Sequence, residues 1–300
     1  MKLMHAAMAG EKRAKEAVYS PGRIAWRKLR RNKLAMFGLI MLVIIVTLVA
    51  LAPVLATHSR DAIEMFSIEK PPSEKHLLGT DDIGRDVFSR LLYGGQVSMS
   101  VGLAAVLLQV LIGVTLGALA GYFGGFVDSL IMRLVDMVMC FPFYVIAISM
   151  AAVLGGSAMN VVIIIGILSW TGVARIVRAQ VMSLRTREFT EAARALGLNP
   201  LDIIVKHMLP NCINPIIVNA TLGMAAAILT EAGLSFLGMG VTPPQPSWGN
   251  MLAAAQNLVA LRSQWWRWLP PGLLVFIVVL SINFFGDGLR DALDPRTRIK

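Results

Sequence analysis

Residues 188–210 read EFTEAARALGLNPLDIIVKHMLP, a short polar segment between two long apolar runs. Residues 137–174 before it and 207–230 at its end contain no Asp, Glu, Lys or Arg. Within the polar segment, residues 190–196 favour a helix because they are rich in Ala and Leu. Gly197 can end that helix, since glycine accepts the left-handed conformation found at helix C-termini. The pattern predicts a helix and a glycine turn outside the membrane, between two membrane-spanning segments.

A second short helix should follow the glycine turn. Asn199-Pro200 can begin it, because asparagine caps free N–H groups and proline tolerates the first helical position. Leu201, Ile204 and Val205 then form an apolar stripe at helical spacing. At Leu209-Pro210 the next apolar run begins. The alternative interpretation is an ordinary hairpin loop without a partner.

The composition places the chain in a membrane. Hydrophobic residues make up 56 % of the sequence and charged residues 15 %, whereas soluble domains have about 25 % charged residues. The net charge of +10 does not indicate nucleic-acid binding, because the charges stand at the ends of apolar runs, as membrane orientation requires. Open sheets cannot satisfy their backbone groups in lipid. The predicted fold class is therefore an all-α membrane protein in contact with lipid.

Gaps between charges indicate the membrane spans, since about 20 apolar residues cross the hydrocarbon core. They predict six helices, at about Leu34–Leu55, within Ser98–Tyr122, two within 137–174 joined at Gly155-Gly156-Ser157, at 207–230 extending to about Gly240, and at 268–286.

Lys and Arg in the flanking segments indicate orientation. Residues 1–33 hold ten Lys/Arg and two Glu (10 − 2 = +8), and residues 175–208 hold six Lys/Arg and three acids (6 − 3 = +3), which favours the cytoplasm. Residues 58–90, called the external loop below, hold five Lys/Arg and seven acids (5 − 7 = −2). The tail 287–300 is weakly positive (4 − 3 = +1). Both termini should be cytoplasmic.

The loop 241–267 conflicts mildly with this topology, because Arg262 and Arg267 place two positive charges outside. The predicted number of helices is even and both termini are predicted to be inside, which places this loop outside. Trp265, Trp266 and Trp268 support that side, because their rings suit the aromatic belt at a membrane face.

The external loop carries a charged motif before the second apolar run. Its acidic and basic residues can pair at helical spacings, and Gly79 and Gly84 allow turns. Thr80 or Asp81 could cap a helix that runs toward the membrane. The motif is either a rigid structural platform or a contact for another protein. The residues concerned are Gly79, Thr80, Asp81, Asp82, Gly84, Arg85, Asp86 and Arg90.

Glu231 is a charge inside an apolar run, which makes it a functional candidate. Such a charge costs roughly 2.5–3.5 kcal/mol at the bilayer centre, so it should not face lipid. It either lines a central pathway or anchors a helix contact. We expect no catalytic residue, cofactor or metal site in this chain, because it contains neither a phosphate-binding Gly-Lys-Ser/Thr motif nor a metal-ligand spacing.

The segment 191–210 resembles the loop by which bacterial ABC-importer permeases dock onto their ATPase. The spacing is Glu-Ala-Ala, three residues, Gly, then eleven residues to Leu-Pro. It departs from the family pattern at His207, where Ile is common. The resemblance implies a coupling loop at 185–208. The expected ATPase-coupling residues are Glu191, Ala192, Ala193, Gly197, Leu198, Pro200, Leu201, Leu209 and Pro210.

Three further motifs, at 78–90, 234–249 and 286–295, resemble the dipeptide/oligopeptide permease family in its C-type subunit. The similarity covers about residues 25–298. It implies a type I ABC-importer transmembrane domain in the bacterial inner membrane. The implied organisation is a cytoplasmic basic segment 1–33, a first helix with the external loop at 34–90, a transmembrane domain at 91–287 and a cytoplasmic tail at 288–300.

The resemblance also implies partners. These are a homologous permease subunit that completes a heterodimer, two cytoplasmic ATPases that bind ATP and Mg²⁺, and an extracytoplasmic solute-binding protein. Peptides are the expected cargo, and the chain itself is not an enzyme. The alternatives are nickel or oligosaccharide import by the same architecture, an ATP-independent channel or secondary transporter, and a membrane receptor without transport.

Overall fold

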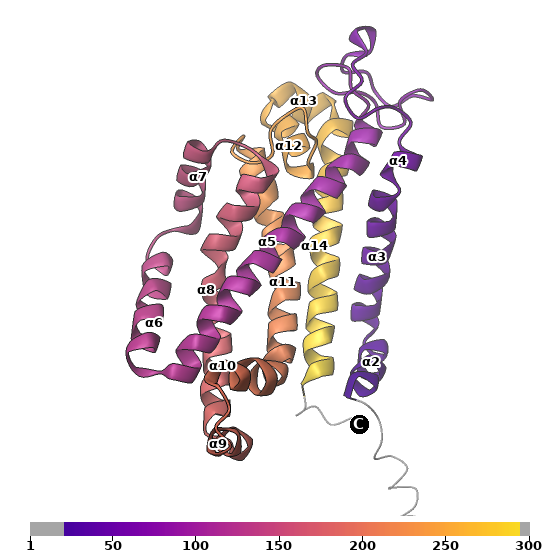
Figure 1. Cartoon of the computed structure of the whole chain (residues 1–300). Coiled ribbons are helices and arrows are strands. Elements are labelled where there is room, and N and C mark those ends of the chain that lie inside the picture. Colours follow the sequence, from indigo (N-terminus) through magenta and orange to yellow (C-terminus); the bar gives the residue numbers. More distant parts are fainter. Residues whose placement is uncertain (1–20, 295–300) are drawn as a thin grey trace, which may run out of the picture.

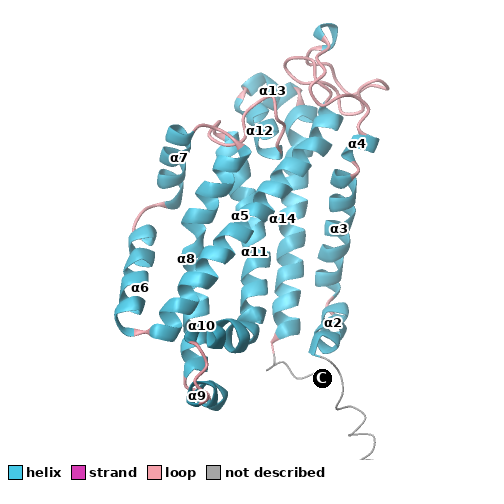
Figure 2. Cartoon of the chain, viewed as in Figure 1, coloured by secondary structure: helices cyan, strands magenta, loops and turns pink. Residues whose placement is uncertain are grey.

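The computed structural model describes residues 21–294, which contain helices and loops but no β-strand (Figure 2). An isolated bridge between Thr80 and Asp86 is the sole β-type pairing in that range. Residues 1–20 of the predicted N-terminal segment and residues 295–300 of the predicted tail lie outside the described residues.

Five helices of the described chain are long and apolar enough to cross a membrane, or six if one bent pair is a single span. The long helices are α3 (Lys33–Ala50), α5 (Val87–Phe123), α8 (Ala158–Arg185), α11 (Leu209–Phe236) and α14 (Trp265–Leu293). The bent pair is α6 (Gly125–Met139) and α7 (Phe143–Leu154). The shorter helices are α2 (Pro21–Arg31), α4 (Ala52–Leu55), α9 (Glu188–Ala195), α10 (Pro200–Asp202), α12 (Trp248–Leu252) and α13 (Leu258–Ser263).

The third span differs from the prediction. It begins at Gly125, twelve residues before the uncharged run at 137, and α6 and α7 meet at an angle of 84°. The two acids of α6 are paired with α8: Arg178 binds Asp128, and Arg175 Nη2 lies 2.8 Å from Asp136 Oδ1. Paired charges can lie within a helix at the membrane surface, so the charge gap marked the start of this helix too late.

Glycines bring α5 and α8 into close contact, and α5 crosses the molecule diagonally in Figure 1. Gly113, Gly117 and Gly121 recur every four residues along α5 and face α8. A Cβ at Gly117 would lie 2.5 Å from the carbonyl oxygen of Ala174, and one at Gly121 would lie 2.7 Å from that of Arg178. Small residues at this spacing allow helix backbones to approach closely in membranes.

The helix α14 packs between α3 and α11, with α2 at its foot (Figure 1). Ile45 of α3, Ile228 of α11 and Val278 of α14 share one buried cluster. Lys28 Nζ donates to the carbonyl oxygen of Asp294 at 3.1 Å. The described chain therefore begins and ends at one side of the molecule, the side that carries α9 (Figure 1).

The outer face of α3 is apolar and exposed, as a helix facing lipid should be. The exposed side chains of its lower and middle turns include Leu34, Phe37, Ile40, Val43 and Ile44. Gly38 on the opposite face approaches α14, where a Cβ would lie 2.5 Å from the carbonyl oxygen of Ser281.

Candidate functional site

The glycine turn of the predicted coupling loop forms as the sequence indicates. Helix α9 ends at Ala195, and Gly197 takes the left-handed conformation with φ of 75°. The N–H of Leu198 donates to the carbonyl oxygen of Ala193 at 3.2 Å, which closes the turn. Asn199 Oδ1 then accepts from the N–H of Leu201 at 3.3 Å, so Asn199 caps α10 with Pro200 at its first turn.

Helix α9 is fixed to the ends of α5 and α8. Thr190 is buried and its Oγ1 donates to the carbonyl oxygen of Leu184 on α8 at 2.8 Å. The guanidinium of Arg194 lies 5.1 Å from the ring centroid of Tyr122 on α5, a cation–π contact. Arg185 Nη1 also donates to the carbonyl oxygen of Tyr122, at 3.2 Å. Ala193 is buried in the same core, so a force on α9 acts directly on both long helices.

The second part of the coupling loop differs from the predicted stripe. Residues Ile203–Met208 form a π-helix that leads into α11. This wider turn buries Ile203, Ile204 and Met208, and it leaves Leu201 and Val205 exposed. The predicted apolar stripe of Leu201, Ile204 and Val205 is therefore divided between a buried side and an exposed side of this segment. The extra residue in each π-turn shifts the register of every following side chain.

Five large apolar side chains of the coupling loop are exposed: Phe189 on α9, with an exposed fraction of 42 %, and four residues that follow α9. The exposed fractions are 81 % for Leu196, 39 % for Leu198, 58 % for Leu201 and 57 % for Val205. We call these four residues the apolar tip. Exposed apolar side chains that gather on one segment indicate a contact with a protein or a membrane. Of the other predicted coupling residues, Glu191, Ala192, Gly197, Pro200 and Pro210 are exposed, and Leu209 is partly buried.

His207, the departure from the family pattern, is partly exposed next to the apolar tip. Its carbonyl oxygen accepts a hydrogen bond from Asn211 Nδ2 at 2.7 Å, on the first turn of α11. The backbone of His207 thus helps to join the π-helix to α11.

The external motif forms a turn rather than the predicted helical segment before α5. Asp81 Oδ1 accepts from the backbone N–H groups of Ile83 and Arg85, at 3.1 and 2.9 Å, and Arg85 Nε donates to Asp81 Oδ2 at 2.7 Å. The cap of α5 is Asp86, not Thr80 or Asp81: Asp86 Oδ2 accepts from the N–H of Ser89 at 2.8 Å. As predicted, Gly79 and Gly84 form turns, with φ of 68° and 84°.

Thr80 and Arg90 are buried and join the motif to other segments. The N–H of Lys70 donates to Thr80 Oγ1 at 2.9 Å. Arg90 Nη1 donates to the carbonyl oxygens of Arg60 and Pro244, both at 3.3 Å. These contacts tie the start of α5 to both ends of the external loop and to the loop after α11.

Arg267 and Trp266 fix α14 to the external loop. Arg267 is buried, and its Nη1 lies 2.8 Å from Glu69 Oε1 while its Nη2 lies 3.5 Å from Asp82 Oδ1. These acids neutralise one of the two positive charges that conflicted with the predicted topology, that of Arg267. Trp266 Nε1 donates to the carbonyl oxygen of Thr80 at 3.2 Å, so this ring is buried in protein instead of a membrane belt.

The same region contains a cleft of about 320 Å³. Its charged lining comes from the external loop and from α14. The residues are Glu69, Asp81, Asp82, Arg85, Arg90 and Arg267. On a nearby part of the loop, the Lys75 ammonium donates a hydrogen bond to Glu64 and lowers the pKa of that carboxyl group.

Sequence reasoning missed a group formed by His58, His76 and Asp86, whose potential ligand atoms lie within 4.8 Å of one another. The two histidines and the aspartate are far apart in the sequence and match no metal-ligand spacing. No short sequence motif predicts that these three residues are neighbours, because only the fold of the external loop brings them together.

Glu231 anchors a helix contact and lines none of the described cavities. It is fully buried, and its Oε2 and Oε1 accept hydrogen bonds from Ser98 Oγ and Ser235 Oγ, both at 2.7 Å. Ser98 Oγ in turn accepts from the N–H of Trp248 at 3.1 Å. Glu231 therefore joins α5, α11 and α12, and the predicted pathway role is not supported by its position.

Glu231→Gln and Glu231→Ala should separate the two roles. Glutamine retains the size of the side chain and a carbonyl acceptor, so we expect near-normal thermal stability and transport. Alanine leaves two buried serine hydroxyls without their partner, which should cost about 1–3 kcal/mol and lower the melting temperature in detergent. A well-folded Glu231→Gln protein that has lost transport would favour a pathway role instead.

Polar side chains of α5, α8 and α11 line two cavities that the sequence analysis did not identify. One, of about 690 Å³, includes Gln180, Asn211, Asn214 and Asn219, and the other, of about 330 Å³, includes Gln109 and Asn219. Asn219 lines both. All of these amides except Gln180 stand in uncharged apolar runs, and that contrast was the available sequence signal.

Two family models match the chain. Residues 113–299 match the binding-protein-dependent transport system inner membrane component, and residues 20–72 match the N-terminal transmembrane domain of oligopeptide transport permease C. The chain belongs to this permease family. Its members are membrane components of transport systems, which confirms the expected class of a non-enzymatic permease subunit and a multi-pass inner-membrane protein.

Relatives of this ABC-importer permease cover nearly its whole length. The dipeptide transport system permease protein DppC of Alkalihalophilus pseudofirmus is 43 % identical over 279 residues, 93 % of this chain and 91 % of the relative. A relative from Brucella suis biovar 1 is 42 % identical over 269 residues, 90 % of this chain and 89 % of the relative.

A solved structure supports the predicted type I fold. The permease is similar to a chain of the inward-facing MetNI methionine ABC transporter, with a TM-score of 0.53 and 17 % identity. The match covers 68 % of this chain and 96 % of that one. As a permease of this family, the chain works with ATPase subunits and other components of the transport system.

Proposed function

We propose that this permease imports di- or oligopeptides and that ATPase subunits drive it through the coupling loop. The observation that carries the proposal is the exposed apolar tip of the coupling loop. Helix α9 of the same loop packs against α5 and α8. A secondary transporter has no use for such a rigid exposed contact. The names of the relative DppC and of the matched oligopeptide permease domain support peptides as cargo.

In the proposed assembly, α9 and both termini lie in the cytoplasm, in agreement with the charges of residues 1–33 and 175–208. Two ATPases hold ATP and Mg²⁺, and one docks on the apolar tip of this chain. A homologous permease subunit covers the cavities that Asn219 lines. An extracytoplasmic solute-binding protein delivers peptide at the charged cleft beside Arg267.

The proposed mechanism is a rigid-body switch between two states. Closure of the ATPases displaces α9, and the contacts of α9 with Tyr122 and Leu184 carry that displacement to α5 and α8. Movement of these helices changes access to the amide-lined cavities from one side to the other. The chain itself performs no covalent step.

Transport by the assembled complex in proteoliposomes tests the proposal. The complex is supplied with ATP on the ATPase side and its binding protein on the other, and labelled dipeptides, longer peptides, Ni²⁺ and oligosaccharides are compared. We expect accumulation of peptides that requires ATP. Accumulation of only Ni²⁺ or sugar would overturn the cargo, accumulation without ATP would overturn the coupling, and binding without accumulation would indicate a receptor.

A further inference from the structure

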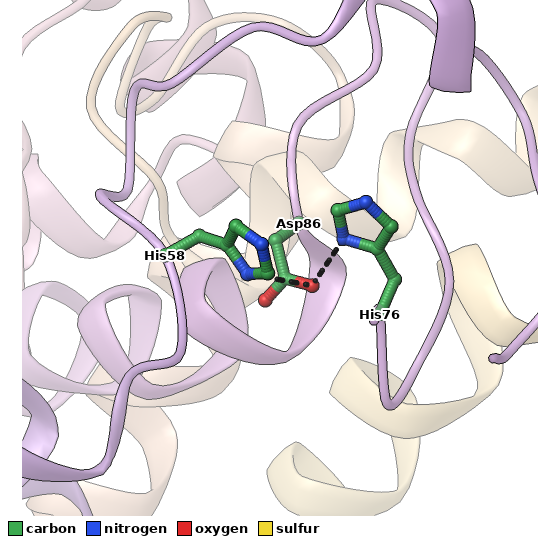
Figure 3. A group of neighbouring side chains, drawn as sticks. All are labelled: His58, His76 and Asp86. Carbon is green, nitrogen blue, oxygen red and sulfur yellow. Dashed lines mark hydrogen bonds and ion pairs between the residues drawn. The ribbon is translucent and has the colours of Figure 1, made fainter. Parts of the chain in front are cut away.

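Three segments of the external loop converge at His58, His76 and Asp86 (Figure 3). His58 follows α4, His76 lies in the middle of the loop and Asp86 caps α5. Asp86 Oδ1 lies 3.0 Å from His76 Nδ1 and 3.7 Å from His58 Nδ1. One carboxylate oxygen therefore faces the same nitrogen of both rings.

The carboxylate of Asp86 is buried and held in place by its other oxygen. Asp86 Oδ2 accepts from the N–H of Ser89 at 2.8 Å and from Ser89 Oγ at 2.7 Å, which leaves Oδ1 directed at the histidines. Among the described residues, no lysine or arginine forms an ion pair with Asp86, and the neighbouring Arg85 and Arg90 pair with Asp81. A buried carboxylate is stabilised by hydrogen bonds and by a cation or a coordinated metal. Asp86 has further hydrogen bonds, from Thr57 Oγ1 to Oδ2 at 3.4 Å and between His76 Nδ1 and Oδ1, so a metal ion would supply the balancing charge.

The histidines are arranged as ligands with an outer carboxylate. Their rings stack with centroids 4.6 Å apart and an interplanar angle of 26°. Their Nε2 atoms face Glu64, at 3.5 Å for His76 and 4.0 Å for His58. Metal-binding histidines commonly donate the second ring N–H to a carboxylate. Glu64 lies on that side of both rings, at separations longer than a hydrogen bond. The buried Nε2 of His76 has no hydrogen-bond partner in the described chain.

We propose that His58, His76 and Asp86 bind a divalent transition-metal ion, with zinc the best fit. Two imidazoles and a carboxylate are a common zinc donor set. Ligands at about 2.0–2.1 Å from a tetrahedral zinc lie about 3.4 Å apart, between the 3.0 and 3.7 Å separations from Asp86 Oδ1. Neutral imidazoles and a divalent ion also balance Asp86 without placing two positive rings in a stack.

The ion would cross-link three segments: the residues after α4, the middle of the external loop and the start of α5. This role is structural and separate from cargo, because none of the three residues lines a described cavity. The inference goes beyond the proposed function and does not depend on it: the external loop would hold zinc whatever solute the complex imports.

Zinc binding by the tag-free, detergent-purified protein tests the proposal. The protein is stripped with EDTA, and Zn²⁺ is then titrated and counted by mass spectrometry after gel filtration. We expect one equivalent for the wild type and a higher melting temperature with zinc. Co²⁺ should give the visible absorption of a site with histidine and carboxylate ligands.

Variants assign the site. His58→Ala and the double variant His58→Ala/His76→Ala should lose the retained ion, and His58→Cys, which restores a zinc ligand, should keep it. Glu64→Gln should weaken zinc affinity about 10- to 100-fold. His207→Ala, a histidine at the opposite side of the fold, is the matched control and should retain one equivalent.

Two outcomes would overturn the proposal. One is a folded wild-type protein that retains no zinc after gel filtration, a result that does not depend on the folding of any variant. The other is retention of a full equivalent by the double variant, which would place the ion elsewhere. Because the readout is metal content, failure of the transport assay leaves this test unaffected.

Discussion

Substitution of Gly197 by proline should abolish ATP-dependent uptake while the protein still inserts in the membrane. Gly197 has φ of 75°, whereas proline fixes φ near −65°. The N–H of Gly197 also donates to the carbonyl oxygen of Arg194 at 2.9 Å, and proline has no N–H. The turn would open and the apolar tip would point away from its partner. Uptake and co-purification of the ATPases are measured at equal permease levels in the membrane.

Glu191→Lys should have the same effect, because it reverses an exposed charge on the first turn of α9, beside the docking surface. Lys206→Ala is the control within the same loop. Lys206 is exposed and, within residues 21–294, its ion pair is with Asp202, at 2.6 Å on the surface. Its loss should therefore cost little, and uptake should persist. Normal uptake by both Gly197→Pro and Glu191→Lys would contradict docking at this loop.

Gly117→Leu should prevent stable packing of α5 on α8. Even the first carbon of a side chain at Gly117 would lie 2.5 Å from the carbonyl oxygen of Ala174 and 3.0 Å from Val177 Cβ. The helices would have to separate, which also breaks the contacts of Gly113 and Gly121. Overpacking of this kind costs about 1–3 kcal/mol, occasionally more. We expect loss of the monodisperse peak in size-exclusion chromatography and a lower melting temperature.

The packing prediction has a control on the facing helix. No atom lies within 4 Å of a Cβ built at Gly172 of α8, so Gly172→Ala should leave the melting temperature near that of the wild type. Gly117→Ala should lower it, by less than Gly117→Leu. Equal melting temperatures for Gly117→Leu and the wild type would show that α5 and α8 do not depend on this close contact.

Local features of the coupling loop could be predicted from the sequence. The glycine turn at Gly197 and the cap at Asn199 depend on residues within a few positions of each other. The π-helix could not be predicted, because it arises from the burial of Ile203, Ile204 and Met208 against α5 and α8. Tertiary packing here outweighs the 3.6-residue periodicity that the sequence suggested.

Charges near the membrane surface explain most of the remaining errors. The charge-gap rule treats each Asp, Glu, Lys or Arg as the end of a span. Asp128 and Arg178 pair across α6 and α8, and Arg267 pairs with Glu69, so Asp128, Arg178 and Arg267 can lie inside helices. Such pairs join residues far apart in the sequence. The same reason kept Asp86 from being recognised as a neighbour of two histidines.

The length of α5 links the two ends of the molecule mechanically. Its 37 residues give a rod of about 55 Å, far longer than the hydrocarbon core of about 30 Å. The end near Asp86 carries the group of His58, His76 and Asp86, and the end near Tyr122 contacts α9. A tilt of this lever moves its two ends in opposite directions. Under the proposed function, a binding protein that favours one tilt must change ATPase affinity, and the ATPase must change binding-protein affinity by the same factor.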